Sequence, residues 1–148
     1  MHELLSCYDC ILKITMQSIC TQVQSDMTGK WYYAEYTTFS LDSESNQYAI
    51  NISGYVGNAG DSLADTNLTS KWYLNGMKFT TYDENNNRSS IAISCGTKFS
   101  AGWWFNNCAF SCLTCKFTGL NFVWLSLTYA INEPTALLKT ARMMIRSN

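Results

Sequence analysis

Two pairs of cysteines have the spacing of a thiolate metal site: Cys7 with Cys10, and Cys112 with Cys115. Taken alone, two CxxC pairs suggest a tetrahedral four-thiolate zinc site. The pairs lie far apart in the sequence, so free thiols or disulfides are favoured over zinc. Seven cysteines in 148 residues indicate some cross-linking in an oxidising compartment, and the odd number leaves one thiol over.

A second chemical feature is the acidic and amide-rich segment Asp83-Glu84-Asn85-Asn86-Asn87. It places side-chain oxygens at alternate positions, as a loop that wraps a calcium ion does. It is not an EF-hand, because arginine and serine stand where that motif needs glycine and its bidentate glutamate. A calcium loop and a plain solvated loop both remain open.

Histidine chemistry is excluded. The one histidine is at position 2, near a terminus that usually frays. Serine and cysteine nucleophiles activated by histidine, HExxH metallopeptidases and histidine zinc sites all need a placed imidazole. We therefore expect no enzyme activity.

Glycine and aromatic clusters have ordinary structural explanations. The segment 54–60 has the spacing GxxGxxG, which differs from the GxGxxG of phosphate-binding loops, so a tight turn is favoured. The cluster Ala101-Gly102-Trp103-Trp104-Phe105 could stack on a ligand such as a sugar, but core packing is the default.

Composition limits the class of protein. Lysine and arginine total 10 against 11 acidic residues, and no basic run exists, which argues against nucleic acid and anionic membranes as partners. The longest apolar run, 122–131, is too short to span a bilayer. The length supports a single domain. No signal peptide is visible, so we expect that the chain is either cytosolic or lacks its N-terminal part.

The elements that would position these residues are mostly strands. Aromatic and β-branched residues predict strands at 8–16, 31–40 and 48–52. Loops are predicted at 40–47, 54–60 and 83–90, and a short helix at 61–66 capped by Asp61. The segment 137–146 fits a helix or a strand equally well.

Several runs together resemble one known family. They are YAEY at 33–36, YAINISGYVGNAGDSL at 48–63, NGMKFTTYD at 75–83, GWWFNNC at 102–108 and LKTARMMIR at 138–146. In this order they look like the fibrinogen C-terminal domain family, with its GxWW…C and LKxTEMKIR signatures. The likeness covers nearly the whole chain, which looks like a single partial domain, 1–148, that begins partway into the family's domain.

The resemblance implies an α+β fold: a twisted, mainly antiparallel sheet with short helices and long loops. It implies one disulfide, Cys95 to Cys108, and gives five cysteines no role. It also implies a calcium site. The corresponding positions are the side chains of Asp83, Asn85 and Asn87 and the carbonyls of Ser89 and Ile91. Lectin-like members have acids where Asn85 and Asn87 stand, so we expect calcium binding that is weak or lost.

The same resemblance implies a pocket for an acetyl group beside the second cysteine of the tryptophan loop, after a strained peptide bond. By position it maps to Asn107, Cys108, Ala109 and Phe99, with Trp104 nearby and Phe122 and Tyr129 as possible walls. Ala109 replaces the family's histidine, which leaves fewer orienting hydrogen bonds.

The function implied is a non-enzymatic recognition module, resembling secreted lectins that bind acetylated carbohydrates in innate immunity. The alternative is a protein-binding or matrix-adhesion module without sugar binding, which Ala109 and the altered calcium loop favour. A third possibility is a decayed copy that folds poorly. The glycosylation sequons at Asn51, Asn67 and Asn87 weakly support an extracellular glycoprotein.

Overall fold

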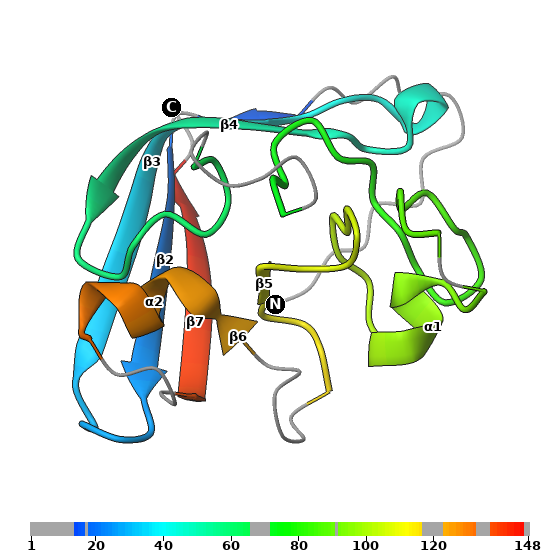
Figure 1. Ribbon diagram of the computed structural model, residues 1–148. Coiled ribbons are helices and arrows are strands. Elements are labelled where there is room, and N and C mark those ends of the chain that lie inside the picture. Colours follow the sequence, from blue (N-terminus) through cyan, green and yellow to red (C-terminus); the bar gives the residue numbers. More distant parts are fainter. Residues whose placement is uncertain are drawn as a thin grey trace, which may run out of the picture.

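The computed structural model describes residues 14–16, 18–65, 72–90, 92–116, 123–132 and 137–146. Strands predominate and helices are short, as Figure 1 shows. In chain order the elements are β1 (Ile14–Met16), β2 (Ser18–Ser25), β3 (Trp31–Leu41), η1 (Glu44–Asn46), β4 (Ile50–Gly57), α1 (Cys95–Phe99), β5 (Ser111–Cys112), β6 (Val123–Trp124), α2 (Leu125–Ala130) and β7 (Leu138–Arg146). None of the described helices is long and apolar enough to cross a membrane.

The main sheet is antiparallel and is built around β3, its longest strand. β4 pairs with one edge of β3, from Ala34 opposite Gly57 to Leu41 opposite Ile50. β2 and then β1 pair with the other edge. β7 comes from the end of the chain and adds to β2, so distant parts of the sequence lie side by side. This architecture confirms the predicted α+β fold with its antiparallel sheet.

Two local predictions are wrong. The segment 54–60 is not one loop, because β4 continues to Gly57 in register with β3. The segment 61–65 is a bend and not a helix. Asp61 still acts as a cap, since its Oδ1 accepts from the amides of Leu63 and Ala64 at 3.1 and 2.8 Å. The carboxylate satisfies these amides without a helical turn.

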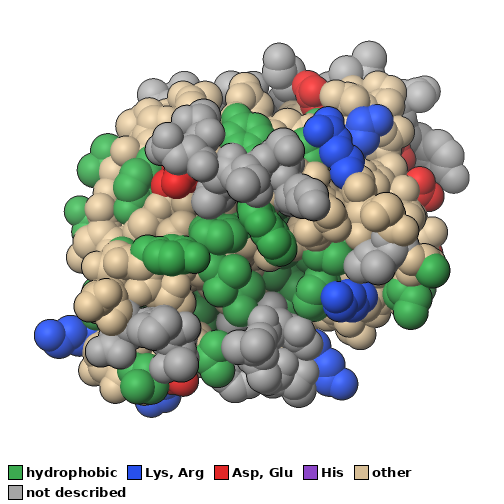
Figure 2. All heavy atoms as spheres, in the orientation of Figure 1, with side chains coloured by type: hydrophobic (Ala, Val, Ile, Leu, Met, Phe, Trp, Pro, Cys, Tyr) green, Lys and Arg blue, Asp and Glu red, His purple; other side chains and the backbone are tan. Residues whose placement is uncertain are grey.

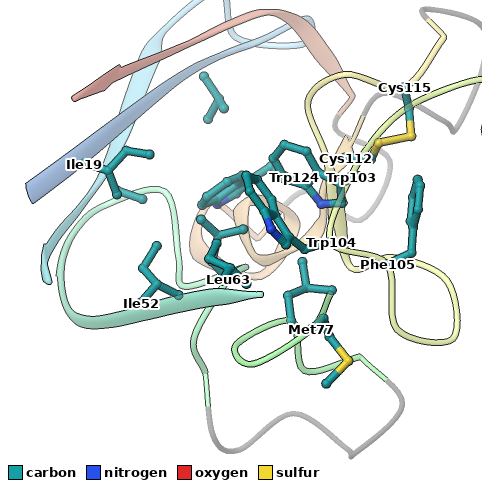
Figure 3. Close-up of a cluster of buried hydrophobic side chains, with 14 of the residues drawn as sticks. Ile19, Ile52, Leu63, Met77, Trp103, Trp104, Phe105, Cys112, Cys115 and Trp124 are labelled. Carbon is teal, nitrogen blue, oxygen red and sulfur yellow. A yellow bond between two sulfur atoms is a disulfide. The ribbon is translucent and has the colours of Figure 1, made fainter. Parts of the chain in front are cut away.

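The hydrophobic core joins the inner face of the sheet to the tryptophan loop. The side chains of Ile19, Ile52 and Leu63 are at most 1% exposed and face Trp103 and Trp124 from the sheet side (Figure 3). Trp104 lies in the same cluster and donates its indole proton to the carbonyl of Tyr48 at 2.9 Å. The aromatic cluster is therefore core, as predicted.

The loop-rich half of the molecule lies opposite the sheet and carries α1 (Figure 1). One short bridge ties its two main loops together: Thr80 and Trp103 exchange backbone hydrogen bonds of 2.9 and 3.0 Å. Hydrophobic side chains gather at the centre of the face in Figure 2, with lysine and arginine toward its periphery. Loops held on a rigid scaffold are where binding residues usually lie.

Candidate ligand-binding site

A disulfide fixes α1 to the tryptophan loop. Cys95 begins α1 and is bonded to Cys108, with the two Cα atoms 5.5 Å apart, which confirms the predicted pair. Ser94 caps the helix by accepting from the amide of Thr97 at 3.1 Å. Ser100 ends it in the left-handed conformation. The helix, the disulfide and the loop therefore form one rigid support.

The predicted calcium loop, 83–90, lies next to this support. Its backbone is anchored to the core side: the Arg88 amide donates to the carbonyl of Asn106 at 3.0 Å, and the Asn86 side chain donates to the carbonyl of Phe79 at 2.8 Å. Asp83 is exposed and accepts from the hydroxyl of Thr81 at 2.6 Å. That hydrogen bond lowers the pKa of Asp83, so its carboxylate is ionised at neutral pH.

The two asparagines of the predicted metal set lie together. The Asn87 side-chain amide donates to Asn85 Oδ1, and Asn87 Oδ1 accepts from the amide of Ser89 at 2.8 Å. Their oxygens are thus engaged within the loop. Ile91 lies outside the described residues. Among the described residues no three histidine, cysteine, aspartate or glutamate side chains gather in one place.

A cavity of about 490 Å³ lies between this loop and α1. Its lining combines an exposed aromatic ring, a carboxylate and several hydroxyls. The lining residues are Thr81, Tyr82, Asp83, Thr97, Ser100, Ala101 and Gly102. Tyr82 is 75% exposed, so its ring is available for stacking. Of the predicted site residues, Asp83 alone lies in this lining.

The predicted acetyl-group residues mostly face the interior. Phe99 stacks on Phe105 with ring centroids 5.7 Å apart, and Cys108 is 7% exposed. Trp104 packs edge-on against Phe79 at 5.1 Å. Asn107 and Ala109 are half-buried beside the disulfide. The peptide bond between Asn107 and Cys108 is trans, like the others in the described segments.

The last two residues predicted for the acetyl-group pocket are Tyr129 and Phe122. Tyr129 lies on α2, 78% exposed, and lines a different cavity with Gly60 and Asp61. Phe122 falls outside the described residues. The structure therefore does not bring Tyr129 together with Phe99 and Cys108.

The second CxxC segment is also a disulfide. Cys112 and Cys115 are bonded to each other, so this pair does not supply thiolates to zinc, while Cys7 and Cys10 lie outside the described residues. Thr114, inside the small disulfide ring, donates its hydroxyl to the carbonyl of Gly102 at 2.6 Å. The CxxC ring thus supports the wall of the cavity. Of the cysteines that the structure describes, Cys20 is free.

Comparison with known proteins identifies a matching family and relatives of this chain. The family model for the C-terminal globular domain of fibrinogen beta and gamma chains matches residues 2–146. A techylectin-like protein of Phoneutria nigriventer is 42% identical over 76 residues, which is 51% of this chain and 30% of that relative. Angiopoietin-4 of Bos taurus is 29% identical over 156 residues, which is 98% of this chain and 26% of that relative.

Solved structures give the same result. The fibrinogen-like globe domain of human ANGPTL6 superimposes with a TM-score of 0.69 at 27% identity, covering 88% of this chain and 56% of that structure. The corresponding domain of human ANGPTL2 gives 0.66 at 29% identity, with 88% and 58% covered. The chain thus spans less than a third of the two curated relatives and somewhat more than half of these solved domains.

Proposed function

Because the chain belongs to the family of the C-terminal globular domain of fibrinogen beta and gamma chains, we propose that it is a non-enzymatic recognition module that binds acetylated carbohydrate. Its ligand occupies the cavity between the 80–90 loop and α1. The observation that carries the proposal is the lining of that cavity, which combines the Tyr82 ring, the Asp83 carboxylate and hydroxyls of Thr97 and Ser100.

The lining suits a sugar for a physical reason. A pyranose ring has an apolar face that packs on an exposed aromatic ring, and hydroxyls that both donate and accept hydrogen bonds. The Asp83 carboxylate accepts, and the Ser100 hydroxyl can do both. The Thr97 hydroxyl donates its proton to the carbonyl of Tyr82 at 3.2 Å, so toward a ligand it acts as an acceptor. The likeness to a techylectin-like protein gives further support.

Calcium has a secondary role in this proposal. Asp83 is the one carboxylate in the predicted ligand set, and the amide oxygens of Asn85 and Asn87 are neutral. Neutral ligands lower calcium affinity by reducing the attraction to the cation. These residues would hold calcium weakly, with a dissociation constant of about 1 mM or above. The ion would then order the loop that carries Tyr82 and Asp83.

The proposal includes secretion. The two described disulfides are Cys95–Cys108 and Cys112–Cys115. Disulfides of this kind are typical of proteins from oxidising compartments. The sequon residue Asn51 is exposed on β4 and accessible to a glycan. The Asn87 sequon lies in the calcium loop, and its side-chain oxygen already accepts from Ser89. A glycan on Asn87 would therefore compete with the metal role of this side chain.

A titration with N-acetylglucosamine tests the site directly. Chemical shifts of backbone amides are followed in the labelled protein, in Tyr82→Ala and in Tyr129→Ala. Both tyrosines are similarly exposed, at 75% and 78%, but they line different cavities. We expect saturable shifts at residues 81–83 and 97–102, lost in Tyr82→Ala and kept in Tyr129→Ala. Equal binding by both variants would refute the assignment.

Binding of a protein partner is the second candidate function. The observation that favours it is the combination of two asparagines in the calcium loop with Ala109 beside the disulfide, which removes charged and orienting groups. Its relatives also include angiopoietin-4 and proteins named angiopoietin-related. In this case the same loops would contact a protein surface, and N-acetylglucosamine would produce no shifts in the folded protein.

A further inference from the structure

A second cavity, of about 390 Å³, lies on the opposite side of the molecule from α1, between α2 and the loop that follows β4. The described lining consists of Gly60, Asp61, Asp65, Phe110, Ser126, Tyr129 and Ala130. No lysine or arginine is among these residues. The cavity therefore brings two carboxylates together with two aromatic rings.

The aromatic wall is ordered but open to solvent. The rings of Phe110 and Tyr129 are parallel to within 4°, with centroids 6.5 Å apart. Phe110 is 7% exposed and also contacts the Trp72 ring, with centroids 6.5 Å apart. Tyr129 is 78% exposed. A planar or cationic group can therefore reach the aromatic surface without rearrangement of the core.

The floor of the cavity is fixed by hydrogen bonds that engage the donors of Ser126 and Trp124. Ser126 donates its hydroxyl to the carbonyl of Asp61 at 2.7 Å, and its amide donates to the hydroxyl of Ser62 at 3.1 Å. Trp124 donates its indole proton to the carbonyl of Gly60 at 2.9 Å. The loop is thus fastened to the start of α2, and these protons do not point to a ligand.

The carboxylate of Asp61 is held in place by three hydrogen bonds. Its Oδ1 accepts from the hydroxyl of Tyr36 at 2.7 Å as well as from the amides of Leu63 and Ala64. All three of these hydrogen bonds are made to Oδ1. An ionised carboxylate can only accept hydrogen bonds.

From this arrangement we infer that the cavity is a binding site for a guanidinium group, presented as an arginine side chain by a protein partner. A guanidinium has five hydrogen-bond donors, no acceptor, a fixed positive charge and a flat face. The cavity offers complementary features: carboxylates of Asp61 and Asp65 that accept, and the Tyr129 ring on which the flat face stacks. A neutral sugar needs donors as well, and the donors of Ser126 and Trp124 at the floor are already engaged.

The inference does not depend on the sugar site, because the two cavities share no described lining residue. Arginine binding is tested separately, by NMR titration of the labelled protein with N-acetyl-arginine amide. The neutral isostere N-acetyl-citrulline amide is the ligand control. We expect shifts at residues 60–65 and 126–130, with affinity that falls as salt is raised, and binding of citrulline at least about tenfold weaker.

Three variants locate the site. Asp65→Asn removes one charge with little change of shape, and Tyr129→Ala removes an exposed ring. Each is expected to weaken arginine binding about fivefold or more. Tyr82→Ala, in the other cavity, is expected to leave it unchanged.

Four results would overturn the inference. They are no shifts in a folded sample, equal binding of citrulline, shifts confined to residues 81–83 and 97–102, and equal perturbation of residues 60–65 by N-acetylglucosamine.

Discussion

Asn85 and Asn87 decide how strongly the predicted metal loop can hold a cation. Each is an amide where lectin-like members of the family have an acid, and the two side chains are hydrogen-bonded to each other. We predict that the double variant Asn85→Asp, Asn87→Asp binds calcium at least about tenfold more tightly than the natural chain, because two charged ligands replace neutral ones. Isothermal titration calorimetry measures the difference.

The matched control for this variant is Lys139→Glu, which also changes net charge by two units. Lys139 is exposed on β7, far from the loop in the fold. It is expected to leave calcium affinity within about twofold of the natural chain, because exposed distant charges are screened. An equal gain from both variants, or none from the double variant, would contradict the assignment of Asn85 and Asn87 as metal ligands.

The buried hydroxyl of Tyr36 should make the folded protein less stable at alkaline pH. Burial and the neighbouring carboxylate of Asp61 raise the pKa of Tyr36 far above its ordinary value of 10. The folded protein keeps this proton while the unfolded chain releases it near pH 10, so the unfolded state binds fewer protons. The free energy of unfolding should therefore fall as pH rises above 10, by up to about 1.4 kcal/mol per pH unit for this group.

Urea unfolding between pH 8 and pH 11 checks this prediction. Tyr36→Phe should be less stable at pH 8 by about 1–2 kcal/mol, because Asp61 loses a donor. Its stability should then decline less steeply with pH. Part of the slope should remain, since burial also raises the pKa of Tyr55. Identical slopes in the two proteins would mean that Tyr36 ionises in the folded state.

At the scale of elements, the junction between the loop after β4 and α2 depends on Gly60. Its φ is +76°, and an added Cβ would lie 2.5 Å from the Cβ of Ser126. Gly76 has nearly the same φ, +78°, but nothing lies within 4 Å of its added Cβ. Gly76→Ala should therefore cost about 1 kcal/mol for the left-handed backbone alone, and Gly60→Ala at least about 3 kcal/mol.

Chemical denaturation of the two glycine variants measures this difference. It separates the strain of the backbone from the clash between elements. Equal costs would show that the loop moves away from α2 without penalty, which would contradict the close packing of Gly60 on Ser126.

The two disulfides should stabilise the fold to different extents. In the chain-entropy model, closing the 14-residue loop between Cys95 and Cys108 contributes about 3 kcal/mol, and closing the four-residue ring of Cys112 and Cys115 about 2 kcal/mol. We predict this order for the pairwise alanine variants in urea unfolding. The smaller ring also holds Gly102 through Thr114. Its removal should therefore weaken sugar binding, and unchanged binding would exclude that support role.

How far the sequence predicts these elements depends on which residues face inward. β3 was predictable because aromatic and β-branched residues fill it. β2 has the sequence SICTQVQS, and two of its four inward positions are the hydroxyl residues Thr21 and Ser25. These break the apolar alternation that marks a strand. The segment 137–146 becomes strand β7 because β2 offers it a partner, which no local pattern contains.

The candidate site was predictable only in part. Family resemblance located the Cys95–Cys108 disulfide and the loop around Asp83. The resemblance did not indicate the cavity beside them. Ser100, which lines that cavity, looks in the sequence like the residue that ends a helix. Tyr82 next to Asp83 was the available signal, since an aromatic residue in a polar loop is unusual. Tyr129 was assigned by position to the acetyl-group pocket beside Cys108, but it lies on α2 and lines the cavity with Gly60 and Asp61.

The whole molecule combines one scaffold with two separate candidate binding cavities. The sheet and the tryptophan core form a continuous hydrophobic cluster that reaches from β2 to the CxxC disulfide (Figure 3). The loops on one side carry Tyr82 and Asp83, and the loop beside α2 carries Asp61 and Asp65. A cooperative thermal transition is expected from such a shared core. A gradual, non-cooperative loss of structure would instead indicate a copy that folds poorly.

Retention on an N-acetylglucosamine resin is the first test of sugar recognition by this protein. The folded protein, verified by a cooperative melt, is applied with calcium and then with chelator, and is eluted with free acetylated sugar. We predict retention that calcium strengthens and that free N-acetylglucosamine releases. The Tyr82→Ala variant should lose this retention, and Tyr129→Ala should keep it. Absence of retention in a folded sample would contradict sugar recognition and favour a protein ligand for the same loops.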